Sequence, residues 1–406
     1  MKRYIVLSVL AVLFVTAFAQ DDALKYRRSS IYSLMINHTD QQFAKEIKEA
    51  FLQIPVPDKF NDHNLSVKVV NMEKKLEGAK KDKENATVTE FLEKNKIASR
   101  LVGRWFNRDF FTGQCDMELV KERGLYNATE FDKQLATRSA RGMAMLQDAG
   151  EELIGNTFVL VNDIRYVDKS KGSKAAGGFL KILGAAASIV TGNNSFQDLG
   201  NNLGDIAESL KGFSVKINTF LYKLDWTDEM ASEFYQEQYA AKPDEAKRKN
   251  FEKGRGKYTL KYVGKVESSG SKTSFLGIKE DEPIIMVRKA CQRAIDENVV
   301  DLQHEYVEFR TSTPLVSVEP ITAYIGMKEG VNSKSKFEVL ETIELENGSH
   351  KYERVGVIEP IPSLIWDNRY MAAEEGAQGA NLGFTTFRKV SGKDFSKGML
   401  IKEMDK

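Results

Sequence analysis

The stretch TFVLVNDI, Thr157 to Ile164, decides the fold more than any other part of the chain. It is a near-continuous run of apolar side chains, whereas a strand with one solvated face alternates apolar and polar residues. A continuous run is typical of a strand that is covered on both faces. We therefore expect residues 157–164 to form a central strand of a sheet with helices packed over it.

Several other segments have the composition of strands or helices around this central strand. A helix at 227–239 is expected to present Met230 and Phe234, and a helix beginning at Pro283 is indicated by apolar residues at helical spacing. Cys291 falls on the apolar face of that second helix, which favours a buried thiol over a disulfide with Cys115. The remaining expected strands are 29–36 (SSIYSLMI), 65–70 (LSVKVV), 213–224 (FSVKINTFLYKL) and 258–266.

An amphipathic helix is expected to precede the stretch IPVPDKFNDHN, residues 54–64. Thr39 followed by Gln42 fits a capping box at its start. Pro55 and Pro57 should end the helix, because the residue before a proline is disfavoured in the helical conformation. The Asp and Asn residues that follow are typical of turns in which the side chain bonds its own backbone. The stretch is therefore interpreted first as a turn.

The pattern changes after Phe309 to short strands. The segment 315–325 reads as one strand, 337–345 and 350–358 flank Asn347-Gly348, a strong hairpin signal, and 382–390 reads as another strand. The sequence therefore predicts an α+β protein. It should have a mixed sheet with packed helices in a large region at 20–310 and a smaller, barrel-like β-rich domain at 311–406.

The first residues have the features of a secretory signal peptide. Lys2 and Arg3 precede an apolar run, and Ala17-Phe18-Ala19 has the small-x-small pattern of a cleavage site. Cleavage is expected after Ala19, which predicts an exported, periplasmic or outer-membrane-associated protein. The formal net charge of the whole chain is only +1. Such a balance gives no long-range attraction to nucleic acid, and no nucleic-acid partner is expected.

The segment 175–191 (AAGGFLKILGAAASIVT) is rich in Gly and Ala and carries one charge, Lys181. Its large apolar residues surround a helix rather than forming a stripe, so the helix would be buried or docked on something. One interpretation is a segment that docks on an envelope protein or a membrane surface; the other is a helix packed within the fold. The docking residues would be Phe179, Leu180, Ile182 and Leu183.

Metal ligation is a second hypothesis for residues 54–64. Asp58, Asp62 and His63, joined by His38, offer the oxygen and imidazole ligands that divalent metals use. The spacing matches neither a calcium loop nor a short zinc motif. Nucleophile and metal motifs such as GxSxG, HExxH, CxxC and GxGxxG are absent from the chain. No catalytic residue and no cofactor can be named from the sequence.

The AFA-Q cleavage site together with "IPVPDKFNDHN", "ELIGNTFVLVNDI" and "LYKLDW" resembles exported proteins of Bacteroidetes-type bacteria that have no established activity. The resemblance implies a periplasmic or outer-membrane-associated location. The order of the elements is also similar, at the level of the fold, to the α/β domains of TolB and the curli secretion lipoprotein. The chain lacks the lipidated cysteine of the latter.

These observations favour a non-enzymatic cell-envelope protein that acts as a binding or assembly module. One alternative is an exported hydrolase of glycan or peptide, whose carboxylates would be brought together by folding. Another is a metal-dependent binding module that uses Asp58, Asp62 and His63. The sequence leaves the ligand, the oligomeric state and the strand order open.

Overall fold

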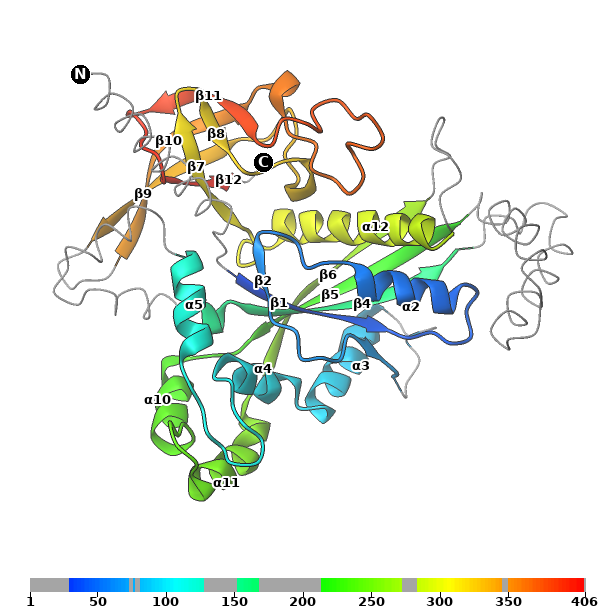
Figure 1. Ribbon diagram of the computed structural model, residues 1–406, viewed down its shortest axis with the longest axis vertical. Coiled ribbons are helices and arrows are strands. Elements are labelled where there is room, and N and C mark those ends of the chain that lie inside the picture. The colour runs from blue at the N-terminus through cyan, green and yellow to red at the C-terminus, as the bar shows by residue number, and fades with distance from the viewer. Residues whose placement is uncertain are drawn as a thin grey trace, which may run out of the picture.

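In the computed structural model, residues 29–72, 76, 81–127, 152–167, 213–271, 283–344 and 350–404 are described. The chain has an α+β fold with two separate sheets (Figure 1). The first sheet has six strands in the order β2-β1-β4-β5-β6, with β3 also paired to β1. These strands are β1 (Ser29–Ile36), β2 (Phe60–Asp62), β3 (Val69–Val70), β4 (Thr157–Tyr166), β5 (Ser214–Leu224) and β6 (Leu260–Ser271).

The run TFVLVNDI is the central part of β4, as its apolar composition predicts. β4 pairs in parallel with β1 on one side and antiparallel with β5 on the other, and its first eight residues are all buried. Because β1 also pairs in parallel with β2 and β3, whereas β5 and β6 are antiparallel, the sheet is mixed. The position of β4 explains why both of its faces are apolar.

Helices cover both faces of this sheet (Figure 1). One face packs against α2 (Ala44–Gln53) and α12 (Pro283–Glu305), through a cluster that includes Phe51 and Cys291. The other face packs against α3 (Lys81–Lys94) and α4 (Ile97–Trp105). Each helix buries an apolar stripe against the sheet, which removes that surface from water.

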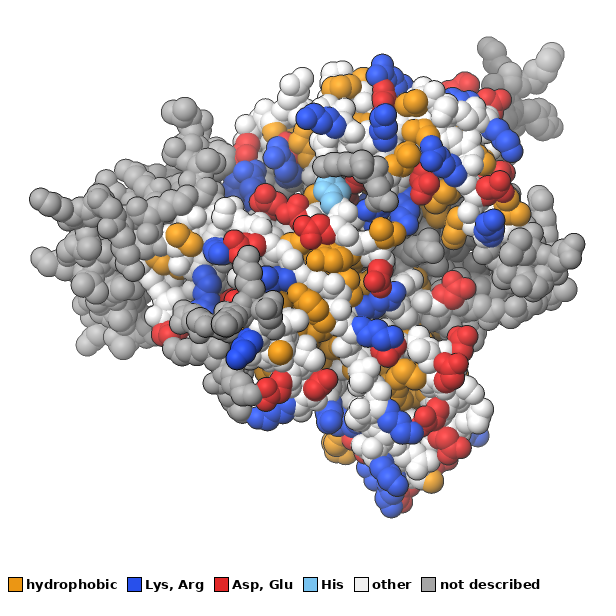
Figure 2. Space-filling model, turned by 180° about the vertical axis from the view of Figure 1, so that it is seen from behind, with side chains coloured by type: hydrophobic (Ala, Val, Ile, Leu, Met, Phe, Trp, Pro, Cys, Tyr) orange, Lys and Arg blue, Asp and Glu red, His pale blue; other side chains and the backbone are white. Residues whose placement is uncertain are grey.

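A smaller lobe extends from one end of the sheet, at the bottom of Figure 1. It contains α10 (Asp228–Glu237), α11 (Glu245–Gly254) and η3 (Arg255–Lys257). Its core is aromatic: Phe106 and Phe234 pack with ring centroids 4.4 Å apart. α5 (Glu118–Asn127), which lies level with the sheet in Figure 1, packs against the same core through Val120. In Figure 2 acidic and basic side chains are interspersed over the visible face of the molecule.

The remaining strands, β7 to β12, bond to one another in a closed ring, β10-β11-β8-β7-β12-β9. We call this unit the β-ring. The predicted domain boundary near residue 311 falls between α12 and β7. That residues 20–310 and 311–406 are two separate domains stays a prediction. The elements of the β-ring are β7 (Ser312–Val318), β8 (Ile321–Ala323), η4 (Met327–Glu329), β9 (Phe337–Glu344), β10 (His350–Pro360), η5 (Pro362–Leu364), β11 (Thr385–Gly392) and β12 (Leu400–Glu403).

Four local predictions were wrong. α2 begins after Phe43, which has a left-handed φ of 57° and no capping side chain, so the Thr39–Gln42 box is absent. Most of 65–70 is not a strand, and β2 lies instead inside the presumed turn. The segment 315–325 contains the hairpin of β7 and β8 rather than one strand. The mixed charges of 241–257 (AKPDEAKRKNFEKGRGK) predict a solvated loop, but residues 245–254 within it form α11, capped by the Asp244 carboxylate.

Both cysteines, Cys115 and Cys291, are free and buried. Burial raises the pKa of the Cys291 thiol to about 12, so it packs as a small hydrophobic side chain. Within the described parts of the chain, no helix combines the length and the apolar composition needed to cross a bilayer.

Candidate functional site

The loop between α4 and α5, residues 107–116, presents two phenylalanines to solvent; we call it the aromatic loop. Phe110 is 62% exposed and Phe111 is 82% exposed, the highest value among the large hydrophobic side chains that the structure describes. Their rings meet edge to face, with centroids 5.4 Å apart. Adjacent exposed apolar side chains make this loop a candidate interaction surface.

Asp109 closes the aromatic loop on itself. Its carboxylate accepts hydrogen bonds from the backbone N–H groups of Thr112, at 2.7 Å, and Phe111, at 3.0 Å, and from the Thr112 hydroxyl at 2.8 Å. The bonds from Thr112 hold the pKa of the Asp109 carboxyl below its ordinary value. The Gly113 N–H also donates to the Asp109 carbonyl, at 3.0 Å. The loop tip is therefore ordered by its own residues.

Arg108 links the base of the loop to α11. Its side chain is only 4% exposed and forms an ion pair with Glu252 at 3.3 Å. The guanidinium lies 4.1 Å from the centre of the Phe251 ring and donates to the Arg248 carbonyl at 3.3 Å. Burial acts to lower the pKa of Arg108, and Glu252 opposes that effect. A buried, paired cation of this kind is costly to displace.

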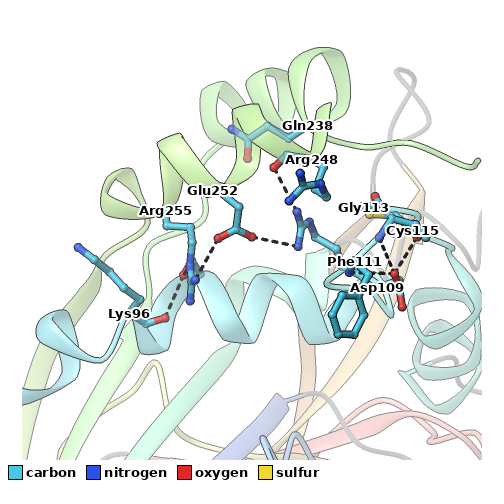
Figure 3. A network of polar contacts seen from close by, with 12 residues as sticks. Lys96, Asp109, Phe111, Gly113, Cys115, Gln238, Arg248, Glu252 and Arg255 are labelled. Atoms are coloured by element: carbon cyan, nitrogen blue, oxygen red, sulfur yellow. Dashed lines mark hydrogen bonds and ion pairs between the residues drawn. The ribbon is translucent and has the colours of Figure 1, made fainter. Parts of the chain in front are cut away.

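The same network continues to the start of α4. Glu252 also pairs with Arg255 at 3.1 Å, and Arg255 Nε donates to the Ser99 hydroxyl at 3.1 Å. Ser99 in turn donates to the carbonyl of Lys96, at 3.0 Å. Figure 3 shows these contacts running along one side of α4 from Lys96 to the aromatic loop. The network therefore fixes the base of the aromatic loop to α11 and α4.

Gly113 allows the aromatic loop to approach α11 closely. Its φ is +74°, and an added Cβ would lie 2.7 Å from the Cβ of Arg248. We expect Gly113→Ala to lower the free energy of unfolding by about 1–3 kcal/mol, because both the left-handed backbone and the contact become strained. Urea denaturation measures this change.

Gly256→Ala is the matched control, because a Cβ there would meet only the Lys96 ammonium, at an ordinary 3.7 Å. The expected change for the control is within about 0.5 kcal/mol. Equal stabilities of the Gly113→Ala and Gly256→Ala variants would contradict the close contact between Gly113 and Arg248 of α11.

A cavity of about 250 Å³ lies next to this network, between α3, α4 and strands β5 and β6. Tyr222 and Tyr258 line it, with Lys96 and Glu93 also present. Both tyrosine hydroxyls have partners elsewhere: Tyr258 donates to the Gln238 side chain at 2.6 Å, and Tyr222 to the Asn85 carbonyl at 3.0 Å. Burial raises the pKa of both phenols, so they stay neutral.

The four residues proposed as metal ligands do not converge. His38 Nε2 forms a hydrogen bond with the Asp163 carboxylate of β4, at 2.5 Å. His63 is buried beside Arg123, with its Nδ1 2.7 Å from that guanidinium. Asp58 pairs with Lys328 of the β-ring, at 3.2 Å.

Asp62, the fourth of these residues, is exposed on β2, and only its backbone carbonyl contacts Arg123. No group of three or more potential ligands occurs among the residues that the structure describes. His38, Asp58, Asp62 and His63 therefore do not form one cluster in the described fold, because each of the two histidines and Asp58 has a separate partner. Metal binding by these residues stays a prediction.

The other predicted site, 175–191 with Phe179, Leu180, Ile182 and Leu183, lies outside the described residues. Sequence reasoning also missed Phe110 and Phe111. The signal was present in DFFTG, residues 109–113. Asp, Thr and Gly are turn residues, and two neighbouring aromatic side chains in a tight turn cannot both reach the core. Comparison of the chain with protein-family models and with curated proteins finds no significant match.

Proposed function

We propose that this protein is a non-enzymatic, exported cell-envelope protein, a binding or assembly module that docks on an envelope protein through Phe110 and Phe111. The observation that carries the proposal is an exposed aromatic pair on an ordered loop. In this proposal the mixed sheet and its helices form the scaffold of the loop. The β-ring is a second, barrel-like domain.

Order in the loop supports binding, because less conformational entropy is lost when a pre-organised element docks. The Asp109 bonds fix the tip and the Arg108–Glu252 pair fixes the base. Aromatic residues dominate the energetics of interfaces, and burying one phenylalanine contributes about 1.5–3 kcal/mol. Two such side chains are enough to act as the anchor of a moderate-affinity contact.

The charge next to the aromatic pair favours a protein partner over an anionic bilayer. Asp109 precedes Phe110 directly, and its hydrogen bonds favour the ionised form. An ionised carboxylate at the inserting tip is repelled by anionic headgroups. A protein pocket, in contrast, can offer an apolar floor for the two rings and a hydrogen-bond donor for the carboxylate.

We expect the double variant Phe110→Ser/Phe111→Ser to bind the partner at least thirtyfold more weakly, since losing about 2 kcal/mol corresponds to that factor. Its thermal midpoint should stay that of the unmodified protein, because both side chains are exposed. A photo-crosslinking residue in place of the exposed Gln114 first captures the partner in whole cell envelopes. The captured partner is then purified, and its affinity for the unmodified protein and for the double variant is measured.

Val390→Ser is the matched control, because Val390 is 49% exposed and lies on the β-ring. A crosslink that depends on the two phenylalanines and not on Val390 is the expected result. If the residue crosslinks only to lipid, the proposed protein partner is incorrect and the loop contacts a membrane surface instead. Crosslinking unaffected by the loss of both phenylalanines would overturn the role of the loop.

A further inference from the structure

The face of α12 turned away from the sheet is polar where it meets the β-ring. Arg293 forms an ion pair with Glu375 at 2.8 Å, and His304 lies 3.0 Å from Glu403. Gly330, which follows η4, packs against Val300 and His304. Figure 1 shows α12 lying between the sheet and the β-ring. Polar interfaces between parts of one chain are those at which relative motion is expected.

Asp296 lies in the middle of this junction. It is only 8% exposed, and its Oδ2 atom has no hydrogen-bond partner in the described part of the chain. The charged groups around it come from three elements: Arg293 on α12, Lys328 and Glu329 on η4, and Asp58 before β2. Burial raises the pKa of the Asp296 carboxyl to about 7, and Lys328 acts against that rise.

Each of the two neighbouring cations already forms an ion pair with another carboxylate. Lys328 pairs with Asp58 at 3.2 Å, and Arg293 pairs with Glu375. Although burial acts to lower it, the pKa of Lys328 is raised by Asp296 and Asp58, so this lysine stays charged. Glu329 accepts from the backbone N–H of Gly326 at 2.8 Å. An ionised Asp296 would therefore share the Lys328 ammonium with the Asp58 carboxylate, and the Glu329 carboxylate would lie close by.

We propose that Asp296 is a proton-operated latch, which holds the β-ring against α12 when the carboxyl is neutral and releases it when the carboxyl ionises. A neutral carboxyl can be buried without a counter-charge, whereas an ionised one requires water or a dedicated cation. Separation of the two surfaces hydrates the carboxylate. The chemistry of the junction therefore links a movement of the β-ring to pH.

The sign of the linkage follows from the two pKa values. In the separated junction Asp296 titrates near the ordinary value of 3.8, and in the closed junction near 7. Between pH 3.8 and about pH 7, the closed form therefore binds a proton at Asp296 more readily than the separated form does. The equilibrium constant for opening rises with pH, by up to about tenfold per pH unit, and levels off above pH 7.

Hydrogen exchange of the full-length protein tests the latch. Amides of η4 and of the part of α12 at 289–304 are followed from pH 5 to 8, with rates corrected for intrinsic exchange. We expect their opening constant to rise by up to about tenfold per pH unit from pH 5, more gently as pH 7 is approached, and to level off above pH 7. The Asp296→Asn variant, which cannot ionise, should show the same constant at every pH. Amides of β4 report global unfolding, so they separate junction opening from loss of the fold.

Asp394→Asn is the control, since Asp394 is a fully exposed carboxylate of the β-ring. This variant should keep the pH dependence of the unmodified protein. The latch would be overturned by a pH-dependent opening that persists in Asp296→Asn. It would equally be overturned by flat opening constants in the unmodified protein. The aromatic loop plays no part in this experiment.

Discussion

Replacement of Trp105 by alanine is expected to lower the free energy of unfolding by about 3–5 kcal/mol, as is typical of large-to-small changes of aromatic residues in a core. Trp105 is fully buried at the end of α4. Its indole N–H donates to the Thr157 hydroxyl at 2.8 Å, and the Arg123 guanidinium lies 4.4 Å from the ring centre. The variant loses these contacts and leaves a cavity beside the first residue of β4.

Urea denaturation followed by circular dichroism measures this change through the midpoint and the slope. Phe111→Ala serves as the control, because it removes an aromatic side chain of similar chemistry that is 82% exposed. The control should change the free energy of unfolding by less than about 0.5 kcal/mol. If Trp105→Ala changed stability no more than Phe111→Ala, the core contacts of α4 described above would be incorrect.

The parts of the fold that could be predicted are those with long, uniform patterns. The apolar run of β4 and the long segment of β5 identify the middle of the sheet, because a central strand buries side chains on both faces. β2 and β3 could not be predicted, since three and two residues are too short to show a period. The strand order was equally hidden, because β1 pairs with β4 across more than a hundred residues of chain.

The candidate site depends on pairings that sequence spacing does not reveal. Arg108 and Glu252 form one ion pair although they are far apart in the chain. Conversely, Asp62 and His63 are neighbours but point to opposite sides, one to solvent and one to the interior. Successive side chains of an extended segment alternate in direction, so adjacent potential ligands in such a segment do not face one metal.

The interior position of His63 leads to the second large effect. Its Nδ1 lies 2.7 Å from Arg123, and its Nε2 lies 2.9 Å from the Leu101 carbonyl. Because a guanidinium only donates, Nδ1 must accept, and Nε2 must carry the hydrogen that is donated to Leu101. The imidazole is therefore neutral. Burial, reinforced by the charge of Arg123, holds the pKa of His63 well below its ordinary value.

His63→Leu should lower the free energy of unfolding by about 3 kcal/mol or more at pH 7.5, because the buried Arg123 loses an acceptor and the Leu101 carbonyl loses its donor. Arg123 is only 4% exposed and cannot replace that acceptor with water. His63→Gln supplies both an amide oxygen and an N–H, so it should retain a larger part of the stability. Urea denaturation of the two variants at one pH gives the comparison.

The pH dependence of stability provides an independent test of the neutral imidazole. The unfolded chain binds a proton at His63 near pH 6.5, whereas the folded protein does not until a much lower pH. The stability contributed by His63 is therefore complete above pH 6.5. It falls by up to about 1.4 kcal/mol per pH unit as the pH decreases below that value. His63→Gln has no such proton to bind, and all other titrating groups are shared with the unmodified protein. The difference between their stabilities should shrink steadily from pH 6.5 to pH 5. A difference that stays constant over this range would show that burial and Arg123 do not hold His63 neutral.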